Sequence, residues 1–445
     1  MASIYILIFN KIFSRLNRPE TPFSERHKPC TLWHMRNNSL VVACIFFLLC
    51  GVVESLVARH VSPDLQYRLT ILICLTLGTA LTFQAWSNNR PRFWSAVRAG
   101  WPLLVFAMLA IASTAWSIMP QSTFLASLAL TFFTFACISL VALSDWGSLL
   151  KGITLACLMI GVLSLLLIPV GGLMTEVHEG DMRGPFREKT RAGMVYAIGA
   201  IASGGLAFTA RKARWLLPIP FFLILLTLSQ SGTSTIACAL GLAALAYGEL
   251  LRGKSSRLVL GVWAGALGAI GIFSLVILNA EVILDALGED STFTGRDRIW
   301  PAVWWRIMES PLLGYGYDAY WRDGSYGMAW LWYEAGFEVY NAHNGWLETV
   351  LAVGLIGALL LAWVIMRTGI AGLTGLYAHN DPRRIAIPMV TMIFMMSLTE
   401  SAIGGPEGPA WLLLLLISTA SALKERQKHA KKSVYNDGII AKVQT

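Results

Sequence analysis

Long apolar runs recur along the whole chain, and they constrain its fold more than any other feature. A helix of about 20 apolar residues crosses the hydrocarbon core of a bilayer. Only 14% of the 445 residues are charged and 56% are hydrophobic, whereas roughly a quarter of an ordinary soluble protein is charged. The sequence therefore predicts an all-α integral membrane protein and excludes the soluble, fibrous and disordered classes.

The runs predict about 12 transmembrane helices. They lie near residues 39–58, 67–87, 100–117, 122–143, 151–173, 191–210, 215–230, 233–250, 258–279, 344–366, 385–402 and 410–423. Six of the seven cysteines fall within these runs at no metal-binding or redox spacing, which indicates packing.

The distribution of Lys and Arg orients the predicted helices. With both termini in the cytoplasm, 25 of the 35 basic residues fall on the cytoplasmic side, as the positive-inside rule requires. This gives a basic cytoplasmic tail at 1–38, a polytopic membrane domain at 39–423 and a second basic cytoplasmic tail at 424–445. The main outer loops cover about 174–190 and 280–342. A net charge of +9 spread in this way does not indicate nucleic-acid binding.

The hairpin predicted at 215–250 has an alternative. Its turn is marked only by the run from Ser229 to Gly232, and a single helix there would reverse the second half of the chain. The basic residues after position 250 would then lie outside. The charge distribution favours the hairpin.

The long outer loop contains a predicted amphipathic helix. Thr294 and Asp297 have the spacing of a capping box, and apolar residues from Ile299 to Met308 recur at helical spacing. Such a stripe suits a helix on the membrane surface or on the roof of the bundle. Pro301 either kinks this helix or marks its first turn.

Two arginines lie near the start of this helix. Arg296 and Arg298 would meet unpaired N–H groups there, and guanidinium groups and helix starts both favour phosphate oxygens. Pairing with local acids such as Asp290 or Asp297 is an equally good interpretation.

The rest of the long loop is rich in aromatic residues. They include Tyr315, Tyr317, Tyr320, Trp321, Trp330, Trp332 and Tyr333. Aromatic residues gather at membrane interfaces in general, which accounts for most of them. Flat rings also pack against the apolar face of a sugar, and Tyr315, Tyr317 and Trp321 are the candidates for glycan binding.

A short polar segment precedes the tenth predicted helix. Asn344 is a good N-cap for it, and His343 would lie just outside the helix start, where a neutral imidazole is favoured as a base. Glu348 lies one turn into the helix. A structural histidine is the competing interpretation of His343.

The shorter outer loop carries four cations within nine residues. Arg183, Arg187, Lys189 and Arg191 oppose the positive-inside trend, which favours an anionic ligand. Nearby acids such as Glu188 could instead neutralise them.

Several segments together resemble the O-antigen ligase and polymerase superfamily, most closely its succinoglycan-type exopolysaccharide polymerases. The resemblance covers most of the chain. The segments run from Thr294 to Trp300, from Pro311 to Gly316, from His343 to Glu348 and from Gly354 to Gly357, with weaker support from Ala115–Pro120 and Ser229–Ser231.

The resemblance implies an enzyme of the bacterial inner membrane, with periplasmic outer loops. Such enzymes act on oligosaccharides linked to undecaprenyl pyrophosphate, and Arg296 would be the diphosphate-binding arginine and His343 the catalytic histidine. Two positions depart from the family pattern: Gly232 replaces an arginine common in ligases, and Thr190 replaces an asparagine usual in the polymerases. The first departure weakens the ligase interpretation more.

The predicted function is a polymerase that joins undecaprenyl-pyrophosphate-linked oligosaccharide repeat units, which are both donor and acceptor. Arg296, Lys189 and Arg191, with Arg187 and Arg298 behind them, would stabilise the leaving pyrophosphate. His343 would accept the acceptor's proton, with Asn344 or Glu348 fixing its ring, or Glu348 would itself be the base.

No outer acidic cluster has convincing metal spacing, so metal-independent transfer without a cofactor is expected. Membrane lipids, chain-length regulators and export proteins are the expected partners. A ligase acting on lipid A core or protein is the first alternative, and a transporter or flippase of lipid-linked sugars is the second.

Overall fold

The computed structural model describes residues 39–58, 63–174, 179–251, 261, 265, 295–322, 324–377, 381–405 and 408–443. Within these ranges the chain is helical, and an isolated bridge between Leu173 and Met182 is the one pairing of extended backbone. The predicted tail at 1–38, most of the predicted helix at 258–279 and Thr294 lie outside the described residues.

The helices follow the apolar runs closely. They are α2 (Ser39–Leu49), α3 (Val52–Ala58), α4 (Pro63–Asn88), α5 (Arg90–Ala99), α6 (Trp101–Ala112), α7 (Pro120–Leu143), α8 (Trp146–Leu167), α9 (Lys189–Ala210), α10 (Pro218–Leu228), α11 (Gly232–Leu251), α14 (Arg296–Glu309), α15 (Tyr326–Ala335), α16 (Gly345–Tyr377), α17 (Ala386–Thr399) and α18 (Pro409–Val443). Eleven of the predicted segments coincide with one or two of these helices.

Six of the described helices are long and apolar enough to cross a membrane. They are α4, α7, the span formed by α8 and the short turn after it, α9, α11 and α16; α5 and α6, bent by 68° at their junction, add a seventh if they form one span. These helices confirm a membrane protein, and the count of about 12 crossings stays a prediction. Helix α5 was not predicted, because its segment is too polar to count as a membrane span. The helix forms because Asn89 caps its start and Pro91 lies in its first turn.

Small residues let the helices approach closely. A Cβ at Gly78 of α4 would lie 2.5 Å from the carbonyl oxygen of Phe132 in α7, and one at Gly199 of α9 would lie 2.4 Å from the Phe222 ring in α10. Helix α9 is surrounded by its neighbours, since residues 192–207 are all buried. Large apolar side chains instead face outward around it, among them Phe83 and Leu166, each 67% exposed.

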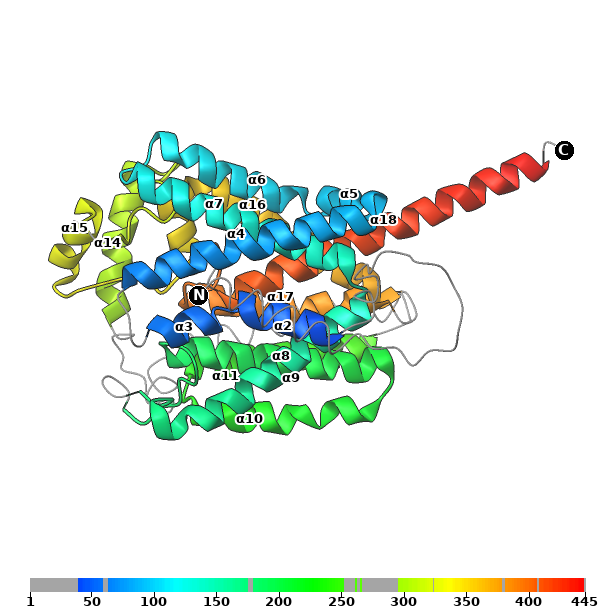
Figure 1. Cartoon of the computed structure of the whole chain (residues 1–445), viewed down its shortest axis with the longest axis horizontal. Coiled ribbons are helices and arrows are strands. Elements are labelled where there is room, and N and C mark those ends of the chain that lie inside the picture. The colour runs from blue at the N-terminus through cyan, green and yellow to red at the C-terminus, as the bar shows by residue number, and fades with distance from the viewer. Residues whose placement is uncertain are drawn as a thin grey trace, which may run out of the picture. The chain divides into compact units, whose positions relative to one another are not determined.

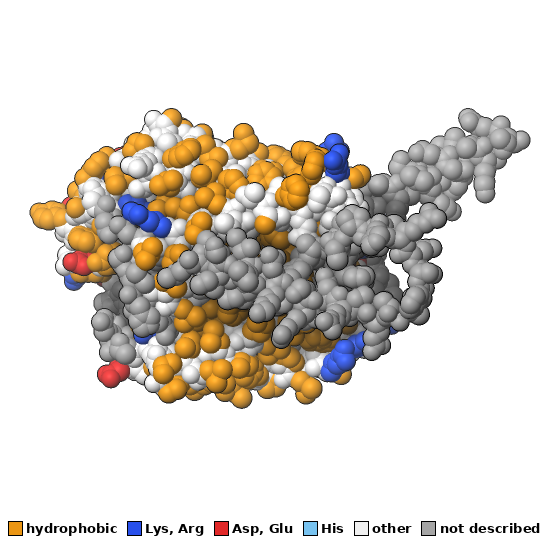
Figure 2. Space-filling model, in the orientation of Figure 1, with side chains coloured by type: hydrophobic (Ala, Val, Ile, Leu, Met, Phe, Trp, Pro, Cys, Tyr) orange, Lys and Arg blue, Asp and Glu red, His pale blue; other side chains and the backbone are white. Residues whose placement is uncertain are grey.

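The described surface is apolar between two more polar ends. On the face drawn in Figure 2, hydrophobic side chains are spread over much of the described surface, and the charged side chains lie toward the ends. Figure 1 shows α14 and α15 together at one end, whereas α18 leaves the bundle at the other. An apolar belt of this kind is the surface that lipid would cover.

Candidate active site

A break in α16 creates the platform for the site. Val353 and Gly354 leave the helical conformation, and Gly354 has φ +71°. The freed carbonyls of Leu351 and Ala352 accept hydrogen bonds from the N–H groups of Tyr315 (2.9 Å) and Gly316 (3.0 Å). The predicted Gly-rich segments at 311–316 and 354–357 are therefore two sides of one contact.

Only glycine fits at the break. A Cβ at Gly354 would lie 1.9 Å from the Leu312 carbonyl oxygen, and the backbone there has a φ that L residues rarely adopt. The N–H of Leu355 completes the contact by donating to the Pro311 carbonyl at 2.8 Å.

The segment after α6 closes the other side of this loop. Trp116 Nε1 donates to the Leu313 carbonyl at 3.0 Å, and the Ile118 N–H donates to the Tyr315 carbonyl at 3.0 Å. Tyr317 N–H donates to Ser113 Oγ at 2.9 Å. Three segments that are distant in sequence thus form one scaffold.

The turn before α16 is fixed by Asn344. Its Oδ1 accepts from the N–H groups of Trp346 (3.0 Å) and Leu347 (3.1 Å), which confirms the predicted N-cap. Its Nδ2 donates to the Leu398 carbonyl at 3.0 Å, so the side chain also ties α16 to α17. His343 precedes it with φ +47°, a left-handed conformation that few non-glycine residues adopt.

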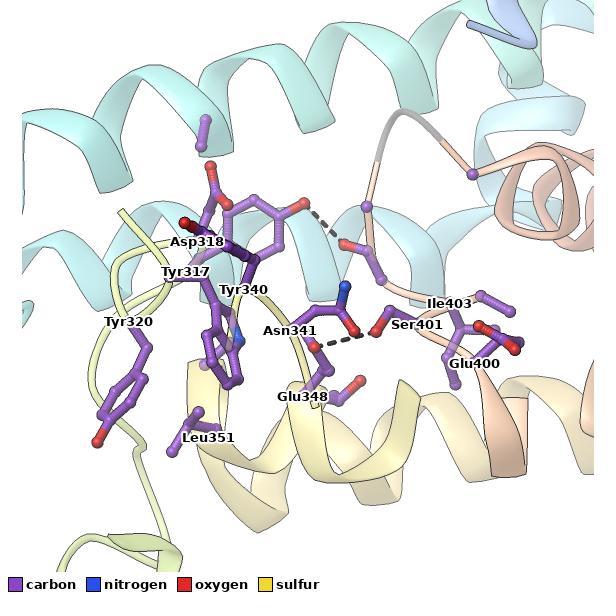
Figure 3. Close-up of a pocket in the computed structure, with 18 of the residues that line it drawn as sticks. Tyr317, Asp318, Tyr320, Tyr340, Asn341, Glu348, Leu351, Glu400, Ser401 and Ile403 are labelled. Atoms are coloured by element: carbon purple, nitrogen blue, oxygen red, sulfur yellow. Dashed lines mark hydrogen bonds between the residues drawn. The ribbon is translucent and has the colours of Figure 1, made fainter. Parts of the chain in front are cut away.

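A cavity of about 460 Å³ lies beside this turn. Five of the predicted site residues line it: Arg187, Arg191, Tyr317, Trp321 and Glu348. Figure 3 shows Glu348 and Tyr317 reaching it from α16 and the long loop, with Ser401 facing Glu348. The cavity therefore combines cations, aromatic rings and a carboxylate.

Two hydrogen bonds orient the Glu348 carboxylate. Oε1 accepts from the N–H of Ala342 at 2.6 Å and from Ser401 Oγ at 3.0 Å. Because Ala342 directly precedes His343, the carboxylate also fixes the backbone that carries the histidine.

The aromatic residues of the cavity have different surroundings. Tyr317 is buried and its hydroxyl donates to the Gly404 carbonyl at 2.7 Å. Burial, reinforced by the charge of Asp318, raises the pKa of Tyr317 well above its ordinary value, so the hydroxyl stays a donor. Arg322 pairs with Asp318 and stacks 3.7 Å from the centre of the Tyr67 ring.

A second hollow of about 640 Å³ lies beside the start of α14. It is lined by Arg296, Asp297, Trp300, Pro301, Trp304, Asn344, Trp346, Leu347 and Leu398. Gly295, with φ +84°, stands at the N-cap of α14 in place of the predicted Thr294. The apolar stripe is confirmed in part, since Ile299, Val303 and Ile307 are buried whereas Trp304 and Met308 are exposed.

Glu400 lies between the second hollow and the first cavity. It lines the first, and its carboxylate lies 3.4 Å from Arg296 Nη2 and 3.7 Å from His343 Nδ1. Arg296 therefore meets Glu400 rather than its neighbour Asp297. His343 is 39% exposed, so its ring is accessible.

Four predicted residues line neither cavity, namely His343, Lys189, Tyr315 and Arg298. Lys189 pairs with Asp181 at 2.8 Å, which is the local neutralisation that the sequence left open. The Tyr315 hydroxyl donates to the Arg306 carbonyl at 2.9 Å, beneath the loop. Arg298 is exposed on α14.

Sequence reasoning missed Glu400 and Ser401. Both follow α17, more than 50 residues after His343, and no motif connects them to it. The one available signal was an isolated carboxylate at the end of an apolar run.

A match to a known family covers part of the chain that builds this site. Residues 215–362 match the family described as O-antigen ligase. The chain is 30% identical over 213 residues to the exopolysaccharide production protein ExoQ of Rhizobium meliloti (strain 1021). That match covers 45% of this chain, which spans about half (48%) of the relative's length.

The family match contains Arg296, His343 and Glu348 but ends before Glu400. It also includes the break in α16 and the loop docked on it. Through these residues part of the chain is similar to the O-antigen ligase family, and part of it is similar to an exopolysaccharide production protein.

Proposed function

We propose that this protein is a polysaccharide polymerase that joins oligosaccharide repeat units carried on undecaprenyl pyrophosphate. The observation that carries the proposal is the first cavity, where Arg187 and Arg191 face the same space as Tyr317, Trp321 and Glu348. Cations suit a pyrophosphate, rings suit a sugar face, and a carboxylate suits proton transfer. The match to an exopolysaccharide production protein supports the same substrate class.

In this reaction an acceptor hydroxyl oxygen bonds to the anomeric carbon of the donor glycan. The bond from that carbon to the pyrophosphate oxygen breaks, and its electron pair leaves with the pyrophosphate. Arg296, Arg187 and Arg191 stabilise the negative charge that develops, whereas Lys189 and Arg298, which line neither cavity, take no part in this step. Guanidinium groups perform this task without a metal ion or cofactor.

His343 accepts the proton of the acceptor hydroxyl. Glu348 fixes the backbone before the histidine through the Ala342 N–H, and Asn344 fixes the backbone after it. Glu348 is the alternative base, since its carboxylate faces the first cavity. Tyr317 and Trp321 hold the glycan, and Tyr315 supports the loop that presents them.

We place the site at the periplasmic face of the bacterial inner membrane, in a bundle of about 12 crossings with both termini cytoplasmic. The loops at 174–190 and 280–342 are then periplasmic. The short connection with Arg211, Lys212 and Arg214 lies on the cytoplasmic side, in agreement with the positive-inside rule. Chain-length regulators or export proteins would meet the protein at this membrane.

The test is elongation by the purified protein in lipid nanodiscs, given a lipid-linked repeat unit alone. A ladder of products is expected, and it should vanish in His343→Ala and Arg296→Ala. Arg214→Ala removes a cation far from both cavities and serves as the control, with a ladder equal to that of the wild type.

A ligase is the second candidate, because the matching family is described by that activity. Glycan that moves only when lipid A core or an acceptor protein is added would establish the ligase. If neither product forms while lipid-linked sugar crosses vesicle bilayers, the protein is a transporter and the proposal fails.

A further inference from the structure

Glu400 contacts two residues of the proposed site at once. Its side chain is only 10% exposed, with Oε1 3.4 Å from Arg296 Nη2 and Oε2 3.7 Å from His343 Nδ1. One carboxylate after α17 thus joins the start of α14 to the turn before α16.

The backbone of Glu400 has a separate structural task. Its N–H donates to the Met396 carbonyl at 2.8 Å, and its carbonyl accepts from the N–H of Gly345 at 3.0 Å. These bonds would form with any side chain at this position. Burying a carboxylate to nine-tenths of its surface costs desolvation free energy, and the backbone hydrogen bonds do not require a carboxylate. The Glu400 side chain therefore has a role of its own.

Arg296 is incompletely satisfied by this carboxylate. Its Nη2 contact is long for a charge-assisted hydrogen bond, and its Nε is buried without a hydrogen-bond partner among the described residues. A diphosphate offers more oxygens than one distant carboxylate. Glu400 therefore engages one donor of Arg296, at Nη2, and leaves Nε without a hydrogen-bond partner among the described residues.

The contact with His343 involves a defined ring atom. Nδ1 faces the carboxylate, so Nε2, on the other side of the ring, is left for a substrate hydroxyl. A carboxylate beside one imidazole nitrogen orients the ring and stabilises the imidazolium that forms when the other nitrogen accepts a proton.

We propose that Glu400 is a positioning residue that acts through both His343 and Arg296. The inference rests on the proposed function, in which His343 takes the acceptor's proton and Arg296 binds the diphosphate. Before substrate binds, Glu400 contacts both residues. The incoming diphosphate takes over the donors of Arg296, and Glu400 then stabilises His343 alone as the proton moves to it from the acceptor hydroxyl.

The kinetic test is Glu400→Gln, which keeps the size of the side chain and removes its charge. We expect kcat to fall about 100-fold, within the range for acid–base groups, because His343 loses its counter-charge. The KM for the lipid-linked donor should fall as well, because Arg296 loses a competitor for the diphosphate. A purely structural role would not lower both constants together.

A second background shows whether Glu400 acts through the histidine. In His343→Ala protein, Glu400→Gln should cause no further loss of the residual transfer rate, which is measured on a single addition. Glu334→Gln, on the exposed side of α15, is the matched control and should leave both constants unchanged. Glu400→Asp keeps the charge, so its kcat should lie between those of Glu400→Gln and the wild type. If the Gln variant does not fold, Glu400→Asp takes its place in the test. Wild-type kcat in Glu400→Gln, or an equal further loss in the His343→Ala background, would overturn the inference.

A binding measurement separates this inference from the proposed function. Inorganic pyrophosphate should bind the Glu400→Gln protein about tenfold more tightly than wild type, which corresponds to about 1.4 kcal/mol of binding free energy. The gain should disappear when Arg296→Ala is added. If the wild type makes no glycan ladder, the proposed function fails, but the binding measurement still tests the contact between Glu400 and Arg296. An unchanged pyrophosphate affinity in Glu400→Gln would refute the role of that contact.

Discussion

Arg383 and Arg296 are both arginines with little exposed surface, but they lie near opposite ends of α16 and differ in how fully they are paired. Arg383, 2% exposed, makes a forked pair with Asp381, with Nη2 to Oδ2 at 2.9 Å and Nε to the same oxygen at 3.1 Å. Arg296, 13% exposed, meets Glu400 at 3.4 Å. Close pairing leaves Arg383 few donors to offer a ligand, whereas Arg296 keeps most of its own.

Arg384, the neighbour of Arg383, is also closely paired. Arg384 donates to Glu249 at 2.5 Å and to the Phe208 carbonyl at 3.2 Å, joining α11 and α9 to the start of α17. The comparison teaches that a buried arginine indicates a ligand site when its donors are only partly used, and a structural role when they are saturated.

The largest effect should come from breaking the saturated pair. Arg383→Ala leaves Asp381 buried without its counter-charge, and we expect the free energy of unfolding to fall by about 3–5 kcal/mol. Equilibrium unfolding in detergent micelles measures it. An unchanged free energy of unfolding in Arg383→Ala would contradict the structural role of Arg383 and with it the contrast with Arg296.

Arg296→Ala should separate activity from stability. We expect kcat/KM to fall about 100- to 1000-fold, because a donor to the developing charge is lost. The loss of unfolding free energy should be smaller than in Arg383→Ala, since the contact removed is longer. Initial rates of elongation and unfolding curves of both variants test this, and equal destabilisation would contradict it.

Asn344→Ala tests whether this residue is a cap or a chemical participant. Losing the N-cap should cost about 1 kcal/mol of unfolding free energy. Elongation should fall in proportion to the folded fraction. A loss of kcat in fully folded protein would instead assign Asn344 to the reaction.

The smallest expected effect is that of Tyr317→Phe. The variant keeps the ring and loses the hydroxyl that donates to the Gly404 carbonyl, which is worth about 0.5–1.5 kcal/mol of unfolding free energy. The KM for the lipid-linked substrate should change less than in Tyr317→Ala, which also removes the ring. Equal KM values in the two variants would argue against stacking on a sugar.

Sequence periodicity predicted the helices well because apolar run length is a local property. It placed α4, α7, α8 and α9 within a few residues of their observed bounds. It missed the break in α16, since Gly354 within an apolar run is compatible with a continuous helix. The reason for the break is a loop some 40 residues earlier in the chain, and no local pattern reports it.

The candidate site was predictable only where motifs are contiguous. Asn344 and Glu348 belong to one short segment, and both lie where the helix start required. Glu400 comes from another helix, and its contacts with Arg296 and His343 depend on tertiary packing. Lys189 looked equivalent to Arg191 in the sequence, but in the structure Lys189 pairs with Asp181 whereas Arg191 lines the first cavity.

The break at Val353 and Gly354 also divides α16 electrically. The eight helical residues from Gly345 to Ala352 form a short dipole of their own, with its positive end beneath Asn344. The N–H groups of Tyr315 and Gly316 cover its negative end by hydrogen bonding to the last carbonyls. An unbroken span would have placed its negative pole at the far side of the bundle. Here both poles lie on the side of the cavity, and the two N–H groups from the loop offset the negative one.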